Sequence, residues 1–276
     1  MDKIAVALGA GGARGFAHIH AIRAFEELGI QPVMISGTSI GAIIGAAACA
    51  GMSADEMTDH ILSKLGSPFT MMGDIFKVRP PSMQGFLKDG GLRIGELNLE
   101  RVLDVFLPDS MPKTFAELAI PLKIAATDYY AQKTTIFEEG DLASAMAASA
   151  AMPAIFLPVQ RDGRFYIDGG ATNPCPLNVL EGAAEHIIAV DVSGGITGDP
   201  AQRPNKIDAM YATSQLMQMS IVRHAVAQHP GVVLLRPPVD SYRVLDFLKA
   251  KNILAQTEPL CDEVKRTIER VLSTTG

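Results

Sequence analysis

The stretch VMISGTSIGAIIGAAACAG, residues 33–51, decides the fold, because a short apolar run, a glycine-flanked turn and a helix of small residues follow one another without a break. The run at 33–36 predicts a buried strand. Residues 40–50 predict a helix that ends at Gly51, the left-handed position at which helices commonly stop. The stretch is therefore interpreted as one strand–turn–helix unit.

The rest of the chain repeats this alternation. Short runs rich in Val, Ile and Ala predict further strands at residues 4–8, 122–128, 187–192 and 232–236. Residues 14–28 predict a helix that ends at Gly29. Strands that alternate with helices in this way indicate an α/β fold.

Three later segments complete the pattern. Residues 205–228 predict a Met-rich helix whose apolar face packs in the core, or alternatively lines a cleft for an acyl chain; that face holds Ile207, Met210, Met217 and Ile221. The C-terminus predicts a surface helix packed through one stripe, formed by Leu260, Val264, Ile268 and Leu272. Residues 66–96 mix Pro, Gly, Met and Phe without a period and predict a flexible cap. We expect one domain over residues 1–276.

Composition excludes several classes of function. The chain has 276 residues, 48% of them hydrophobic, which is enough to bury a large core. A formal charge of -6 and the lack of a basic cluster argue against binding nucleic acid. The cysteines are far apart and form no CxxC pair, which predicts neither a zinc site nor a disulfide and favours a reducing cytoplasm; they are Cys49, Cys175 and Cys261. We expect no metal ion and no cofactor.

Two segments bear on export and membrane insertion. The N-terminus has an acid at position 2 and too short an apolar core for a secretory signal, so no export is expected. Residues 31–54 carry no charge over a length that could cross a bilayer. Pro32, four glycines and several hydroxyls dilute the apolar character of this segment. A strand, a turn and a buried helix explain it better than a membrane span.

Ser39 stands at the centre of a G-x-S-x-G pattern, Gly37 to Gly41. With a strand before it and a helix after it, this serine would occupy a tight, strained turn, and the glycines on either side remove Cβ atoms that would collide. The N-terminus of the following helix would direct its positive dipole end at Ser39. The pattern predicts a nucleophile; the alternative is a serine that only caps a packed helix.

A second glycine-rich segment, Gly9 to Gly15, follows the first strand and opens the first helix. A dinucleotide site would need a third glycine where Arg14 stands and an acidic residue at the end of the second strand, and neither is present. A phosphate-binding P-loop would need Gly-Lys-Ser/Thr. The remaining interpretation is an oxyanion hole formed by the N–H groups of Gly11, Gly12 and Ala13.

No histidine is well placed to take the proton of Ser39. A histidine base should follow the serine on a loop at the carboxyl ends of the strands. His186 and His229 each precede a strand, and His224 falls within a helix. His18 and His20 fall within the first predicted helix, where a packed or surface imidazole is the more common finding.

An aspartate is the better candidate for the base. Asp168 ends a short extended run and is followed by Gly169 and Gly170, which let the backbone turn closely around a site. A poorly solvated carboxylate beside a serine hydroxyl can act as a general base. A simple Asp-Gly turn is the alternative for this residue. Asp128 and Asp191, also at strand ends, are rival bases without adjacent glycines.

Taken in order, the segments Gly9–Gly15, Gly37–Gly41 and Asp168–Gly170 resemble the patatin-like phospholipase family. The blocks at 148–159 and 168–177 are also similar to those that frame the site in bacterial members. The resemblance covers residues 4–192. It implies a three-layer α/β fold with a mainly parallel central sheet flanked by helices, and metal-free acyl hydrolysis of lipids by a Ser-Asp dyad.

By this resemblance Ser39 is the nucleophile and Asp168 the general base. The oxyanion loop comprises Gly11, Gly12, Ala13 and Arg14, with Arg14 bracing the loop. The supporting glycines of the motifs are Gly9, Gly15, Gly37, Gly41, Gly169 and Gly170. One departure is His20, where the family pattern has glycine, and it puts the packing of the first helix in doubt.

The expected activity is that of a phospholipase A or lysophospholipase, an esterase that forms an acyl-enzyme. An acyltransferase or thioesterase with the same dyad is the alternative within enzymes, and a non-catalytic adaptor is the alternative outside them. The expected partner is a lipid or acyl-ester substrate, met in the cytoplasm or in transient contact with a membrane surface. The lipid head group and the oligomeric state are not predicted.

Overall fold

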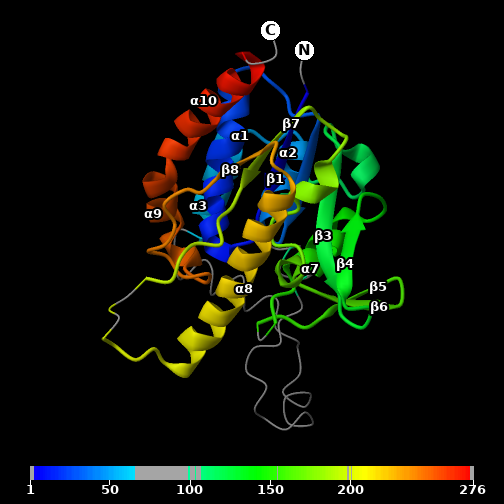
Figure 1. Ribbon diagram of the computed structural model, residues 1–276. Coiled ribbons are helices and arrows are strands. Elements are labelled where there is room, and N and C mark those ends of the chain that lie inside the picture. The colour runs from blue at the N-terminus through cyan, green and yellow to red at the C-terminus, as the bar shows by residue number, and fades with distance from the viewer. Residues whose placement is uncertain are drawn as a thin grey trace.

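The computed structural model of the protein describes residues 3–65, 99, 103, 107–153, 155–197, 199 and 201–273. The segment predicted to be a flexible cap, residues 66–96, lies outside the described residues. Figure 1 shows a central sheet with helices on both sides.

The sheet has the strand order β5-β6-β3-β2-β1-β7-β8, with β4 paired to β3. Its parallel part consists of β1 (Ile4–Leu8), β2 (Met34–Thr38), β3 (Leu122–Asp128), β7 (His186–Val190) and β8 (Val232–Leu235). These are the predicted strands, with ends shifted by up to two residues. The antiparallel part consists of β4 (Lys133–Phe137), β5 (Val159–Arg161) and β6 (Arg164–Ile167).

Alternate residues of β1 show how the layers form. Val6 and Leu8 belong to the larger core, which also contains buried side chains of α1 (His18–Glu27), α2 (Ile40–Cys49), α3 (Ala54–Leu65), α7 (Leu142–Ala150), α9 (Ala250–Thr257) and α10 (Pro259–Ser273). Ala5 and Ala7 belong to a smaller core that includes Val222 of α8 (Lys206–Gln228). Successive strand residues point to opposite faces, so helices cover both faces of the sheet. The predicted three-layer α/β fold is confirmed.

The helices differ from the predictions in two places and agree in a third. Gly12–Ala17 forms a 3-10 turn, so the α-helical part of the first predicted helix begins only at His18. The C-terminal stripe is buried as predicted at Leu260, Val264 and Ile268. The prediction of core packing for the Met-rich helix is wrong, because Met210 and Met217 of α8 are exposed.

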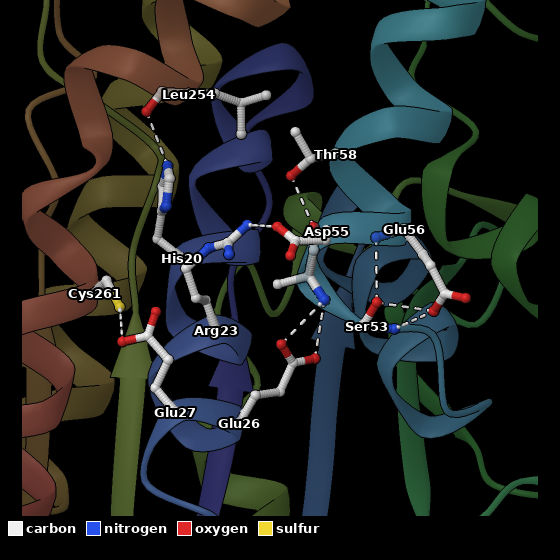
Figure 2. Close-up of polar contacts among 11 residues, drawn as sticks. His20, Arg23, Glu26, Glu27, Ser53, Asp55, Glu56, Thr58, Leu254 and Cys261 are labelled. Carbon is white, nitrogen blue, oxygen red and sulfur yellow. Dashed lines mark hydrogen bonds and ion pairs between the residues drawn. The ribbon is translucent and has the colours of Figure 1, made fainter.

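Polar contacts join α1 to α9 and α3 (Figure 2). The buried His20 donates from Nε2 to the carbonyl of Leu254 in α9 at 2.8 Å, so the departure from the family pattern at this position serves helix packing. The Glu26 carboxylate accepts the Ala54 N–H at the start of α3 at 2.9 Å. These contacts hold the helix that follows directly after the glycine-rich segment.

Within the described residues, no helix is both long and apolar enough to cross a membrane. The uncharged segment 31–54 forms β2, the serine turn, α2 and the start of α3, as the sequence predicts.

Candidate active site

Ser39 occupies a strained turn between β2 and α2. Its φ of 56° and ψ of -123° lie in a region that non-glycine residues seldom adopt. Its side chain makes no capping hydrogen bond to α2, so the alternative role of Ser39 as a helix cap is excluded. A Cβ atom on Gly41 would lie closer than 3.0 Å to the Leu8 carbonyl oxygen, and one on Gly37 would meet the Gly41 carbonyl in the same way. Only glycine allows these backbones to approach so closely.

The Ser39 hydroxyl donates a hydrogen bond to Asp168, with 2.6 Å between Oγ and Oδ2. Asp168 follows β6 directly, and its other oxygen, Oδ1, accepts the Gly170 N–H at 2.7 Å. Both side chains are buried; Ser39 is 5% exposed and Asp168 8%. The hydroxyl and the carboxylate therefore meet directly, across 129 residues of sequence.

Burial makes Asp168 a stronger base than an ordinary aspartate. Desolvation raises the pKa of its carboxyl from 3.8 to about 6, although the hydrogen bonds from Ser39 and Gly170 oppose the rise. The carboxylate is thus ionised at neutral pH but close enough to neutrality to accept a proton from the serine hydroxyl.

The histidines lie where they cannot replace this carboxylate. His186 opens β7 at the amino edge of the sheet, and His224 lies within α8. His229 contacts the Ala225 carbonyl through Nδ1. His18 contacts the Gly9 carbonyl through Nε2 at 2.8 Å, and burial lowers its pKa to about 4. Among the described residues, no histidine forms a hydrogen bond with the Ser39 hydroxyl.

The two rival aspartates have other partners. Asp128 accepts hydrogen bonds from Arg164 at 2.8 Å and from the Ala131 N–H at 2.9 Å. Asp191 is bonded to Arg236 at 2.9 Å. Each carboxylate is held in a structural ion pair, so neither competes with Asp168.

The glycine-rich segment lies beside the serine turn. A Cβ atom on Gly15 would lie closer than 3.0 Å to the side chain of Ile40, the residue after the serine. Arg14 is buried and donates from Nε to the Gly11 carbonyl at 3.2 Å, so it braces the loop as expected. Burial lowers the pKa of Arg14 to about 10, and the charges of Asp191 and Asp240 oppose this.

One expected oxyanion donor is engaged elsewhere. The Ala13 N–H donates to the carbonyl of Val244, at 2.9 Å. Within the described part of the chain, the amides of Gly11 and Gly12 donate to no backbone carbonyl. Of the three expected donors, these two therefore have no backbone acceptor in that part of the chain, while Ala13 anchors the loop. The partner of Ala13 comes from a segment after β8, and no local sequence signal indicates it.

Sequence reasoning also missed Ser149, whose Oγ accepts the backbone N–H of Ser39 at 2.8 Å. In the sequence, only the family resemblance of the block at 148–159 marks this position. Among the described residues, no group of His, Cys, Asp and Glu could hold a metal ion. Cys49, Cys175 and Cys261 are free and buried.

A sequence model described as patatin-like phospholipase matches residues 6–180 of this chain, a range that contains Ser39, Asp168 and the glycine-rich segment. The chain belongs to the patatin-like phospholipase family. The family match ends before β7, so the segment that anchors Ala13 lies beyond it.

Relatives in this family are considerably longer than the chain. Uncharacterized NTE family proteins of Mycobacterium bovis and Mycobacterium tuberculosis are each 33% identical over 228 residues, which cover 80% of this chain and 59% of theirs. Neuropathy target esterase sws of Drosophila melanogaster is 29% identical over 278 residues, covering 89% of this chain and 18% of that protein. The chain therefore matches only part of each relative.

The fold of a patatin-like neighbour is also similar. The crystal structure of VipD from Legionella pneumophila superposes with a TM-score of 0.50 at 16% identity, covering 95% of this chain and 67% of that one. At this identity the likeness concerns the fold alone.

Proposed function

We propose that the protein is a serine acyl hydrolase that cleaves carboxylic esters of lipids through a Ser39–Asp168 dyad. The observation that carries the proposal is the direct hydrogen bond from the Ser39 hydroxyl to a buried carboxylate, at 2.6 Å, with no imidazole between them. Membership of the patatin-like phospholipase family supports a lipid ester as the substrate. Among such esters, a phospholipid or lysophospholipid is the substrate we propose.

In the first half of the reaction, Ser39 Oγ attacks the ester carbonyl while Asp168 takes the hydroxyl proton. The bond to the alcohol breaks, and the alcohol leaves with the proton that Asp168 returns. In the second half, Asp168 removes a proton from water, which attacks the acyl-enzyme. The bond to Ser39 Oγ breaks, the fatty acid leaves, and Asp168 gives its proton to Ser39 to restore the hydroxyl. A carboxylate has no tautomer to fix, so no third residue is required.

The negative charge that develops on the carbonyl oxygen needs donors that are already in place. The amides of Gly11 and Gly12 are in a loop held by two hydrogen bonds, one from the Arg14 side chain to the Gly11 carbonyl and one from the Ala13 N–H to the Val244 carbonyl. The start of α2 adds its positive dipole end near Ser39. Preorganised donors of this kind stabilise an oxyanion because they need not reorient during the reaction.

The test is turnover of a short-chain ester and of a phospholipid by purified wild type and three variants. Ser39→Ala and Asp168→Asn are each expected to lose about 10³-fold or more in kcat. Ser36→Ala is the matched control, because its buried hydroxyl donates to the Pro176 carbonyl at 2.9 Å and does not contact the dyad. It should keep nearly full activity.

Undiminished turnover by Ser39→Ala or Asp168→Asn would refute the dyad. Adding an acyl-CoA and an alcohol acceptor to the same assay distinguishes the alternatives, because a transferase would form a new ester in place of free fatty acid. An adaptor would show no turnover in any variant.

A further inference from the structure

The C-terminal turn of α7 contacts the backbone of both members of the dyad. Ser39 donates its N–H to Ser149 Oγ at 2.8 Å. Asp168 donates its N–H to the carbonyl of Ala151 at 3.0 Å. Ser39 and Asp168 are 129 residues apart in the sequence, and this one turn is an element that they share.

We propose that the end of α7, through the hydroxyl of Ser149 and the carbonyl of Ala151, positions the nucleophile and the base against each other. Ser149 is then a positioning residue, because it acts through the Ser39 amide and not on the reacting atoms. The inference rests on the proposed function, and it assigns a role to a residue of the block at 148–159, outside the glycine-rich segment and the motifs that contain the dyad.

The direction of the hydrogen bonds at Ser149 is fixed by its surroundings. A serine hydroxyl has one proton, and here that proton goes to the Ala125 carbonyl of β3 at 2.6 Å. A lone pair is therefore left to face the Ser39 N–H. The same Ala125 carbonyl packs against Gly169, where a Cβ atom would come closer than 3.0 Å to it. Ser149 thus lies completely buried between β3 and the serine turn.

The local sequence explains why α7 ends where the carbonyl of Ala151 can accept a hydrogen bond from Asp168. Pro153 disfavours helical backbone at Met152, and Ala151 already leaves the helix with φ -71° and ψ 71°. Its carbonyl accepts from Asp168 instead of from a further turn. Asp141 caps the other end of α7 by accepting the Ser144 N–H at 2.7 Å. Both ends of the helix are therefore fixed by local sequence.

The Ser39 amide is the group where such support matters most. A serine with a φ of 56° is strained, and strained backbone persists only when its surroundings determine it strongly. Without the Ser149 hydroxyl, this buried amide loses its acceptor, and the turn can relax. A shift of about 1 Å at a reacting atom costs on the order of 100-fold in rate.

The experiment compares Ser149→Ala with Ser36→Ala. Both variants remove a completely buried hydroxyl that donates to a backbone carbonyl, but only Ser149 also accepts the amide of the nucleophile. We expect kcat for a soluble ester to fall by about 10- to 100-fold in Ser149→Ala, with KM changed by less than about 3-fold. In Ser36→Ala both constants should stay within about 3-fold of wild type.

A pH profile separates positioning from a general loss of folded protein. The hydrogen bond from Ser39 lowers the pKa of Asp168, so a misaligned serine lets that pKa rise. The acid limb of kcat/KM should therefore move to higher pH in Ser149→Ala and remain in place in Ser36→Ala. A loss of folded protein alone would lower kcat/KM by the same factor at every pH, so the acid limb would stay at the same pH.

The inference is overturned when Ser149→Ala matches Ser36→Ala in kcat and in the acid limb while Ser39→Ala is inactive; the dyad then stands. Undiminished turnover by Ser39→Ala would refute the proposed function itself. If Ser149→Ala does not fold, Ser149→Cys takes its place, because a thiol is a weaker donor and acceptor. For Ser149→Cys, the proposal predicts a smaller fall in kcat than for Ser149→Ala and an acid limb of kcat/KM that again moves to higher pH. Kinetics like those of wild type would overturn the proposal.

Discussion

At the scale of single residues, the proposed chemistry depends on a buried carboxylate that water does not solvate. Desolvation raises the pKa of Asp168, and its two hydrogen bonds, from Ser39 and Gly170, are too few to cancel that effect. Asp128 shows the opposite outcome, because hydrogen bonds from Ala131 and Arg164 lower its pKa. The environment thus separates a basic carboxylate from a structural one.

The raised pKa predicts that the base costs stability. Between pH 3.8 and about 6, the folded protein keeps a proton on Asp168 that the unfolded chain has lost, so stability falls as pH rises through this range. The full effect is about 3 kcal/mol. Asp168→Asn has no such cost, so its gain in unfolding free energy over wild type should be larger at pH 7.5 than at pH 4. Urea denaturation at several pH values measures this, and a gain independent of pH would contradict it.

Nearby glycines mark Ser39 and Asp168 in the sequence, but they leave Asp128 and Asp191 as rival bases, and only the structure shows that Ser39 is hydrogen-bonded to Asp168. The sequence was not sufficient for Ser149 or for the engagement of Ala13 by Val244. Those contacts join residues more than 100 positions apart, and each has at least one backbone group as a partner, so residue types alone do not signal the pairing.

At the scale of elements, the tight turn at Ser39 is possible because β2 and α2 pack closely on β1. Gly41 of α2 meets the Leu8 carbonyl, and Gly45 approaches Ile35 of β2. The strands were predicted well because parallel strands buried on both faces form continuous apolar runs. The burial of the apolar face of α8 was not predicted correctly, because helical spacing shows which side chains share a face but not whether another element covers that face.

Gly41→Ala should therefore be severely destabilising, by about 3 kcal/mol or more, because the new Cβ would overlap the Leu8 carbonyl. The control is Gly231→Ala, where the added Cβ would meet nothing within 4 Å. That variant should change the unfolding free energy by less than about 0.5 kcal/mol. Thermal and urea unfolding measure both, and equal effects of the two substitutions would count against the close packing described for the turn.

At the scale of the whole molecule, exposed apolar side chains gather toward the carboxyl edge of the sheet. Tyr129 and Tyr130 follow β3, and Phe165 lies beside them on β6. The described part of the chain has seven other large hydrophobic residues that are exposed. They follow α7 (Leu157), β7 (Ile196) or β8 (Leu245 and Leu248), or they lie in the first 12 residues of α8 (Met210, Leu216 and Met217), and Figure 1 shows where these elements lie. Ser39 and Asp168 lie at the same edge. We therefore propose that this edge makes the transient contact with a lipid surface that is expected from the sequence.

Replacing Tyr130 and Phe165 together by serine should weaken sedimentation with phosphatidylcholine vesicles by several-fold. Tyrosine and phenylalanine favour the boundary between water and lipid, and these side chains are 77% and 40% exposed. Turnover of a soluble short-chain ester should stay unchanged. The control is Tyr130→Phe, which keeps the ring and should keep the binding. Equal sedimentation of the double variant and wild type would rule out this edge as the contact surface.

The central claim is that Ser39 is activated by Asp168 alone, and the rate of covalent labelling by a fluorophosphonate as a function of pH tests it most directly. We predict an adduct on the peptide that contains Ser39, formed with loss of fluoride, and a labelling rate that rises through one inflection near pH 6. Asp168→Asn should remove that inflection and slow the labelling. An adduct on another residue, or the same inflection retained in Asp168→Asn, would contradict the account.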